Sequence, residues 1–268
     1  MRILAKAYAK VNIGLRIMGQ RPDGYHDLDS YFHLVALHDD IDLSVEASSL
    51  TRVRIRGNEG YLKEGQTDLM EKAARLFALE AGLAFDLEIA IDKRIPFQAG
   101  LGGGSSDASA VLRALEKAFG NPLGQERLMA LSLAIGSDVP FFTSGLVAAH
   151  AQGRGEVLEP VDSAPGEVLI VMRPGDKVST IEAFSRADAR GGGRSPLPGW
   201  TTEKEAWQEL YDNDFDFLQP ILADRRYLAA VRNSVYHETS GSGAAQLVVP
   251  SGGEDFGDLA VIRTALCE

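Results

Sequence analysis

A glycine-rich segment in the middle of the chain constrains the fold more than any other feature. It reads AGLGGGSSDA and runs from Ala99 to Ala108. The residues before it, 85–91, alternate between apolar and polar and predict a strand. After it, we expect a helix from about Ser105 to Phe119, because apolar residues recur there at helical spacing. The chain must therefore turn from a strand into a helix within a few residues that are mostly glycine.

The glycines of this segment suit a phosphate site. Gly100 and the run Gly102–Gly104 permit positive φ and carry no Cβ that would block a ligand. Their N–H groups, with the free N–H groups and positive dipole end of the following helix, can converge on an anion. The alternative is a flexible turn capped by Ser105 or Ser106. Three consecutive glycines lose more backbone entropy on folding than a cap requires, so we favour phosphate binding.

Other phosphate-binding signatures do not fit the segment. No lysine follows the glycines, as a P-loop requires, and a dinucleotide fingerprint read from Gly100 has Ser105 in place of its last glycine. The chain also has no H-R-D catalytic loop of the protein kinases.

Composition narrows the class of protein. The net charge of −11 argues against a nucleic-acid binder, although a local group of N–H donors can still hold a small anion. The 268 residues can bury one large core or two modest lobes. The single cysteine, Cys267, excludes an internal disulfide, and no cysteine-based metal site is visible. No apolar run reaches about 18 residues and the N-terminus reads as a strand, so we expect a cytoplasmic protein without a membrane span.

The order of the remaining patterns predicts an α+β fold with mostly antiparallel strands and helices grouped between them. Strands are expected as two segments within 2–18, and at 31–37, 41–47, 51–57, 145–151, 167–172 and 244–250, and helices at 68–81, 125–135, 202–211 and 223–234. The segment 186–200 is rich in Gly, Pro and Arg and reads as a mobile surface loop. A weakly marked boundary divides the chain into an N-terminal lobe, 1–158, and a C-terminal lobe, 159–268.

The glycine segment resembles the phosphate loop of the GHMP kinase superfamily, which comprises small-molecule kinases without a Walker motif. The residues that match that loop are Pro96, Gly100, Leu101, Gly102, Gly103, Gly104, Ser105 and Ser106. Within the superfamily, one branch phosphorylates the 2-hydroxyl of 4-diphosphocytidyl-2-C-methyl-D-erythritol in the non-mevalonate (MEP) route to isoprenoid precursors. Four stretches are similar to that branch in order and spacing: 9–32, 95–112, 135–142 and 240–245. The likeness is strong over 7–150 and thin beyond.

This resemblance implies a two-lobed fold with mostly antiparallel sheets and with helices packed between and against them. It implies an ATP-dependent kinase that uses Mg²⁺ and a small-molecule substrate containing cytidine diphosphate. Ser105 and Ser106 would offer hydroxyls to the nucleotide phosphates or to Mg²⁺, and the metal ligands are left open. We expect no nucleic-acid or membrane partner, and a monomer or a weak homodimer. Asp107, in the first turn of the helix, is expected to be structural.

The resemblance assigns catalysis to Lys10 and Asp138. Asp138 would accept the proton of the substrate hydroxyl, and Lys10 would keep that carboxylate ionised and steady the charge on the transferring group. The residues alone leave other roles open. Lys10 would otherwise be an edge-strand lysine that reaches solvent, and Asp138 a turn or N-cap aspartate.

The resemblance also assigns substrate binding. Tyr25 and His26 would hold the cytosine, and Phe184 would complete an aromatic sandwich with Thr180 nearby. Asn12 lies two residues after Lys10, on the same side of the strand, and would bond the substrate or the catalytic carboxylate. The alternatives are surface packing for the Tyr-His pair and a strand-end amide for Asn12.

The sequence leaves the interpretation of two parts of the C-terminal half undecided. The turn at 239–248 resembles the C-terminal glycine motif of the family, which closes over the phosphates, or is an ordinary glycine-rich turn. The tail after it and the segment 186–199 depart from the family pattern.

Two alternative functions are kept beside the one that the resemblance implies. The first is another GHMP kinase, acting on a mevalonate- or homoserine-like substrate, and the second is a nucleotide-binding module without catalysis.

Overall fold

A computed structural model describes residues 1–58, 67–172, 179–190 and 195–268. Contacts between Cα atoms divide the chain into two compact units. Unit 1 contains Met1–Ala9, Leu37–Phe97 and Gly102–Leu146, and unit 2 contains Lys10–Ala36, Gln98–Leu101 and Val147–Glu268. The expected lobe boundary at 158/159 coincides with no edge of these units, and as a division into functional lobes it stays a prediction.

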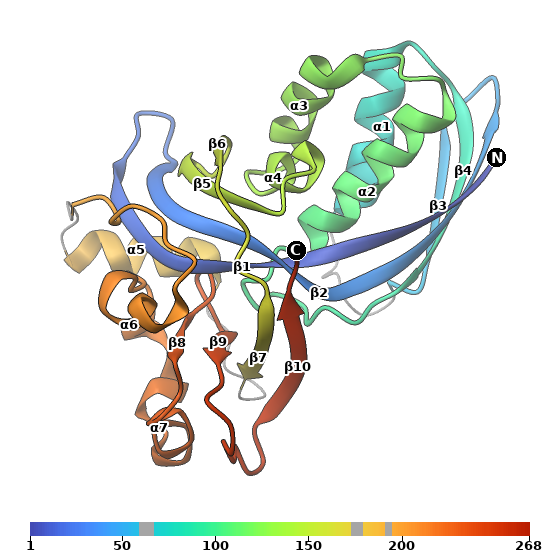
Figure 1. Ribbon diagram of the computed structural model, residues 1–268. Helices are drawn as coiled ribbons and strands as arrows, with labels where there is room; N and C mark the ends of the chain where they lie inside the picture. The colour runs from blue at the N-terminus through green and yellow to red at the C-terminus, as the bar shows by residue number, and fades with distance from the viewer. Residues whose placement is uncertain (59–66, 173–178, 191–194) are drawn as a thin grey trace. The chain divides into compact units, whose positions relative to one another are not determined.

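Unit 1 is a layer of strands covered by helices. The second half of β2 pairs antiparallel with β4, from Asp40 opposite Asp92 to Ala47 opposite Phe85, and β3 pairs parallel with β4. Helices α1 and α2 run side by side over these strands (Figure 1). The elements are β2 (His26–Ala47), β3 (Arg52–Arg56), β4 (Phe85–Asp92), α1 (Leu69–Ala81), α2 (Gly103–Ala118), α3 (Gly124–Ile135) and α4 (Val139–Ser144).

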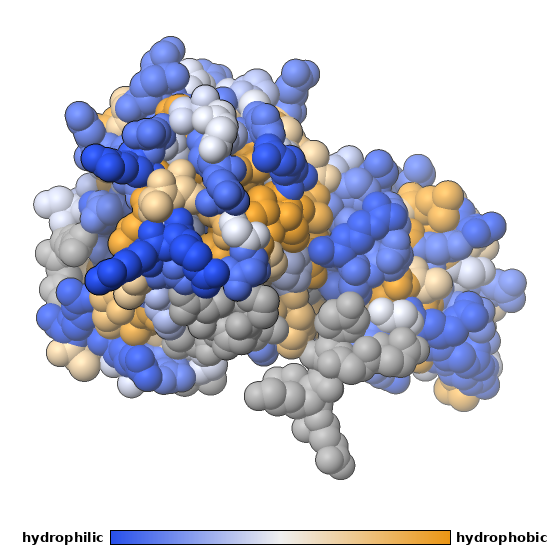
Figure 2. All heavy atoms as spheres, turned by 90° about the horizontal axis from the view of Figure 1, so that it is seen from below, coloured by the Kyte–Doolittle hydropathy of each residue, from blue (hydrophilic) through white to orange (hydrophobic). Residues whose placement is uncertain are grey.

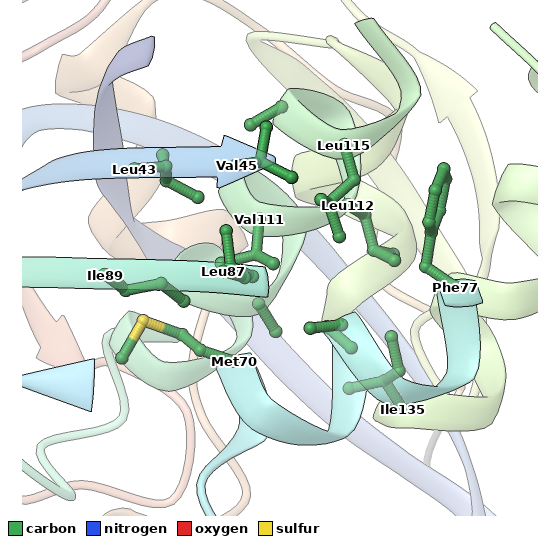
Figure 3. Packing of buried hydrophobic residues seen from close by; sticks show 14 of the residues in the cluster. Leu43, Val45, Met70, Phe77, Leu87, Ile89, Val111, Leu112, Leu115 and Ile135 are labelled. Carbon is green, nitrogen blue, oxygen red and sulfur yellow. The ribbon is translucent and has the colours of Figure 1, made fainter. Parts of the chain in front are cut away.

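The core of unit 1 follows from the periodicity of the sequence. Every second residue of β4 is buried, as alternation predicts, and these side chains meet the apolar faces of α1 and α2. Figure 3 shows Leu87 of β4 next to Val111 of α2, in one cluster with Ile89 and Leu112. Close packing of this kind fixes the start of α2 relative to β4 within the unit.

Unit 2 is built mainly from antiparallel strands. The first half of β2 pairs with β5, β5 with β6, β7 with both β10 and β9, and β9 with β8, all antiparallel. The strands are β1 (Arg2–Gln20), which runs through both units, β5 (Ala148–Gly153), β6 (Val157–Pro160), β7 (Gly166–Met172), β8 (Tyr236–Thr239), β9 (Gln246–Val249) and β10 (Ala260–Leu266). The helices are α5 (Thr180–Arg190), α6 (Trp207–Leu210) and α7 (Arg225–Val231), with 3₁₀ turns at Lys204–Ala206, Asp216–Leu218 and Pro220–Ala223.

The structure confirms the α+β class and corrects several elements. β1 is one continuous strand instead of two segments; within it Lys10 donates to Asn12, and Asn12 donates to Ser30 of β2, so both polar side chains have partners. β2 is likewise continuous where two strands were expected. Helix α5 extends to Arg190, so the loop expected from 186 begins later, and residues 191–194 lie outside the described part. The expected helix at 202–211 is reduced to a 3₁₀ turn and α6.

The surface is mixed. On the face that Figure 2 shows, hydrophilic residues cover most of the area and apolar residues appear in separate patches. Among the helices described, none combines the length and the apolar character that crossing a bilayer requires.

Candidate functional site

The main chain before α2 is held by its carbonyl groups. In unit 2, the carbonyl of Ala99 accepts from Ala245 N at 3.1 Å, that of Gly100 from Ser240 Oγ at 3.1 Å, and that of Leu101 from Lys10 N at 3.0 Å. Within the described chain, the N–H groups of Gly100 and Leu101 donate to no acceptor. The carbonyls are thus used to fix the loop, and the amides remain available for a ligand.

Gly100 cannot be replaced by a residue with a side chain. Its φ is +78°, and a Cβ there would lie 2.1 Å from the carbonyl oxygen of Ser240 and 3.0 Å from that of Gly243. Only glycine adopts this conformation at so close an approach. The first glycine of the motif is therefore required by contact with the turn at 239–245.

Helix α2 begins two residues earlier than the sequence predicts, at Gly103. Gly102 is its N-cap, with φ of +69° and no side chain to cap the helix, and Ser106 N makes the first helical bond to Gly102 O at 2.9 Å. The N–H groups of Gly103, Gly104 and Ser105 make no hydrogen bond to any residue that the structure describes. A helix start with uncapped amides and its positive dipole end is suited to an anion.

The serines of the motif differ in burial. Ser106 is 3% exposed, whereas Ser105 is half-buried and Gly104 is exposed. Pro96 precedes the loop and belongs to unit 1. The start of α2 thus presents one accessible hydroxyl and one buried hydroxyl beside its amides.

A buried charge cluster lies behind the start of α2 in unit 1. Lys93 Nζ donates to Asp39 at 2.6 Å and to Asp107 at 2.7 Å. Asp39 also accepts from the main-chain N–H groups of Arg94 and Ile95. Burial raises the pKa of Asp107 to about 7, although Lys93 acts to lower it. Asp107 therefore points toward Lys93 and takes part in holding the helix start in place.

Lys10 and Asn12 lie on the same side of β1, as the spacing predicts. Lys10 is 3% exposed; its Nζ donates to Asn12 Oδ1 at 2.6 Å and lies 4.3 Å from the centre of the Phe32 ring. Asn12 Nδ2 donates to Ser30 Oγ at 2.8 Å, which fixes the amide so that its oxygen faces the ammonium. The structure thus contradicts the reading of Lys10 as an edge lysine in solvent.

Asp138 immediately precedes α4 in unit 1. It occupies the N-cap position, yet its carboxylate makes no capping hydrogen bond to the helix, so the reading of Asp138 as an N-cap residue is not supported. Lys10 belongs to unit 2, so its closeness to Asp138 stays a prediction.

The predicted cytosine-binding residues lie in unit 2 and have partners that the sequence did not indicate. Tyr25 is 49% exposed, and the guanidinium of Arg154 lies 3.5 Å from the centre of its ring. His26 is buried; its ring stacks on Phe184 at 4.4 Å between centroids, and its Nε2 lies 2.8 Å from Asp188 Oδ1. Phe184 therefore contacts His26 directly, and its role opposite Tyr25 stays a prediction.

Thr180 is exposed at the first position of α5, and its role stays a prediction. Arg154 and Asp188 were missed by the sequence analysis. Arg154 stands between two glycines in a turn, which was a usable signal for a cation at a site, whereas the contact of Asp188 with His26 spans 162 residues and had none.

The turn at 239–245 is rigidly held. Asn213 Nδ2 donates to the carbonyls of Thr239 and Gly241, and Gln219 Nε2 donates to that of Ser242. Ser240 Oγ in turn contacts Gly100, as described above. These contacts favour the glycine motif over an ordinary surface turn.

Comparisons with known proteins identify the family of this chain. Residues 68–146 match the model of the GHMP kinases N terminal domain. A 4-diphosphocytidyl-2-C-methyl-D-erythritol kinase of Prosthecochloris aestuarii is 32% identical over 256 residues, which cover 91% of this chain and 87% of that protein. One of Desulfotalea psychrophila is 36% identical over 187 residues, which cover 69% of this chain and 62% of that protein, less than two thirds of its length.

A crystal structure of 4-(cytidine 5'-diphospho)-2C-methyl-D-erythritol kinase is similar over 99% of this chain and 100% of that chain, with a TM-score of 0.75 and 30% identity. This likeness confirms the expected GHMP-kinase-like fold. Because the likeness in sequence extends over most of a relative's length, this chain belongs to the 4-diphosphocytidyl-2-C-methyl-D-erythritol kinase family of the GHMP kinases.

Proposed function

We propose that this chain transfers the γ-phosphoryl group of ATP to the 2-hydroxyl of 4-diphosphocytidyl-2-C-methyl-D-erythritol, in the non-mevalonate route to isoprenoid precursors. The observation that carries the proposal is the conformation of the glycine loop. In unit 2 the carbonyls of residues 99–101 are bonded to the protein, and in unit 1 the amides of Gly103–Ser105 are open at the start of α2. This is the arrangement that a chain of phosphates requires.

The phosphoryl transfer is assigned to two side chains. Asp138 would orient the substrate hydroxyl and accept its proton, and Lys10 would stabilise the negative charge that develops on the transferring group. The buried position of Lys10, fixed by Asn12, supports this role, because an ammonium in a site of low dielectric acts more strongly than one in water.

The substrate would be held through its nucleotide. Tyr25, His26 and Phe184 supply aromatic surfaces for the cytosine, and Thr180 lies on the same helix as Phe184. Arg154, which lies over the Tyr25 ring, adds a positive charge suited to the diphosphate. A pyrimidine nucleoside diphosphate fits this combination of aromatic rings and one cation.

Mg²⁺ would be held mainly by the phosphates of ATP. The described residues contain no group of three His, Cys, Asp or Glu side chains arranged around a metal, and Mg²⁺ usually keeps several waters and few protein ligands. The hydroxyls of Ser105 and Ser106 are oxygen donors at the start of α2 and fit such a cation. Bound there, Mg²⁺ neutralises charge on the phosphates.

A turnover assay with ATP, Mg²⁺ and the cytidyl substrate tests the proposal. Asp138→Asn keeps the shape of the side chain and removes the base, so we expect kcat to fall roughly 10²- to 10⁴-fold with little change in the KM for ATP. Asp92→Asn, which alters an exposed acid that pairs with Arg94, serves as the matched control and should keep full activity. A wild-type protein that binds ATP without turnover would contradict the proposal and favour a nucleotide-binding module.

A further inference from the structure

Helix α5 fixes the ring of His26 in two ways. Phe184 stacks on the ring with an angle of 14° between the planes, which sets its orientation. Asp188, one turn further along the same helix, places Oδ1 2.8 Å from Nε2. Rotation of the ring would break both contacts, and burial restricts it further, because His26 is only 8% exposed.

This contact decides which ring nitrogen carries the hydrogen. A neutral imidazole has one N–H donor and one acceptor nitrogen, and an ionised carboxylate only accepts. Asp188 therefore holds the hydrogen on Nε2, and Nδ1 presents its lone pair. Within the described chain, Nδ1 makes no hydrogen bond, so its lone pair is available for a ligand.

We propose that Asp188 is a specificity-determining positioning residue, which makes His26 an acceptor toward the base and so selects cytosine over uracil. The inference rests on the proposed function, in which His26 faces the pyrimidine. Cytosine presents an amino donor at position 4, whereas uracil presents a carbonyl acceptor there. An acceptor at Nδ1 pairs with the first and leaves the second unpaired and repelled. Asp188 does not touch the substrate itself.

Calorimetric titration with CDP and with UDP tests the inference. A saturating non-hydrolysable ATP analogue keeps both probes out of the ATP site. We expect the wild type to bind CDP at least about tenfold more tightly than UDP, the value of roughly one well-made hydrogen bond. Asp188→Ala should reduce this ratio to about two- or threefold, mainly by weakening CDP. The side chain of Asp188 is 43% exposed and alanine favours helices, so the variant should fold.

Glu182→Ala is the matched control. Glu182 is an acid on the same helix that pairs with Arg186 and does not contact His26. Its removal should leave the ratio of CDP to UDP affinity unchanged. A fall in the ratio as large as that of Asp188→Ala would show that the loss of any α5 acid is enough, and would overturn the inference.

The nitrogen chemical shifts of His26 give a readout that does not depend on binding. We expect the wild type to show hydrogen on Nε2 and a bare Nδ1, and Asp188→Ala to show a mixture of the two tautomers. The His26 signals are assigned by their loss in His26→Gln. Hydrogen on Nδ1 in the wild type would overturn the inference, as would a ratio of affinities that Asp188→Ala leaves unchanged.

The two proposals fail in different ways. If the wild type binds neither CDP nor UDP, the proposed function fails and the choice of base fails with it. If the wild type binds both with equal affinity, or if Asp188→Ala keeps the preference for CDP, only the role of Asp188 is wrong.

Discussion

Lys93 in unit 1 lies between the carboxylates of Asp39 and Asp107, whereas Glu238 in unit 2 lies against another acid, Asp216. Asp39, Asp107 and Glu238 are buried, but the two clusters reduce their charge by different means. The pKa of Glu238 is raised to about 11, mainly by burial and secondly by the hydrogen bond with Asp216. This side chain therefore keeps its proton at neutral pH. In unit 1 the neutralising charge is an ammonium, and in unit 2 it is a proton.

The two clusters support different segments of the chain. A Cβ on Gly103 would lie 3.6 Å from Lys93 Nζ, so the first cluster adjoins the helix start that we assign to phosphate binding. Glu238 instead accepts from Thr239 N at 3.1 Å, and the Thr239 hydroxyl donates to Asp216, so the second cluster anchors the start of the turn at 239–245. The first cluster therefore supports the start of α2 with an ammonium shared by two acids, and the second supports the turn with a protonated acid.

Removal of Lys93 should have the largest effect. Lys93→Met leaves two buried acids without their cation, and we expect the free energy of unfolding to fall by about 3–5 kcal/mol at pH 8. At pH 5 the loss should be smaller, because burial raises the pKa of Asp107 and a protonated acid needs no cation. Urea unfolding at both pH values measures this. Lys117→Met, at an exposed position of α2, is the control and should change stability by less than about 0.5 kcal/mol.

Glu238→Gln should have an effect of the opposite sign. The folded state holds a proton that the unfolded state loses above its pKa of about 4.5, so wild-type stability falls as pH rises from there toward 11. Glutamine has no such proton, and we expect the variant to be more stable by roughly 1–3 kcal/mol at pH 8. Near pH 5 the gain should nearly vanish. A variant less stable than wild type at pH 8 would mean that Glu238 is ionised in the folded protein.

Asp107→Asn should have the smallest effect on stability. The pKa of Asp107 rises from 3.8 to about 7 on folding, so wild-type stability declines between these pH values and the variant should lack this decline. The lost ion pair with Lys93 offsets the gain, leaving a net change under about 1 kcal/mol at pH 8. The KM for ATP should fall about two- to threefold, because one acid near the helix start is gone. Glu238→Gln should leave this KM unchanged; equal responses of the two variants would break the comparison.

The sequence predicted the residues whose type is dictated by the local backbone. Gly100 and Gly102 have positive φ, which few other residues adopt, and so the loop could be predicted from its residue types without knowledge of its contacts. Lys10 and Asn12 were readable as a pair because strand residues two apart share a side. The apolar alternation in β4 likewise located the core of unit 1.

The sequence could not predict contacts between residues that are distant along the chain. The pairing of Lys93 with Asp39 spans 54 residues, and no local pattern marks either as the partner of the other. Asp188 was placed in a surface loop because glycine and proline follow shortly after it, yet α5 continues to Arg190, supported by an ion pair between Glu182 and Arg186. The tail after the glycine turn, which departs from the family pattern, forms β10 against β7, although no strand was expected there.

The close approach of Gly100 to the carbonyl of Ser240 ties together two pieces of chain that are 140 residues apart. Protein engineers who wish to exchange the glycine-rich loop among relatives must transfer residues 96–106 and 239–245 together. In a chimera that receives only residues 96–106, the two backbones would no longer fit at Gly100, where one added methyl group is enough to force them apart.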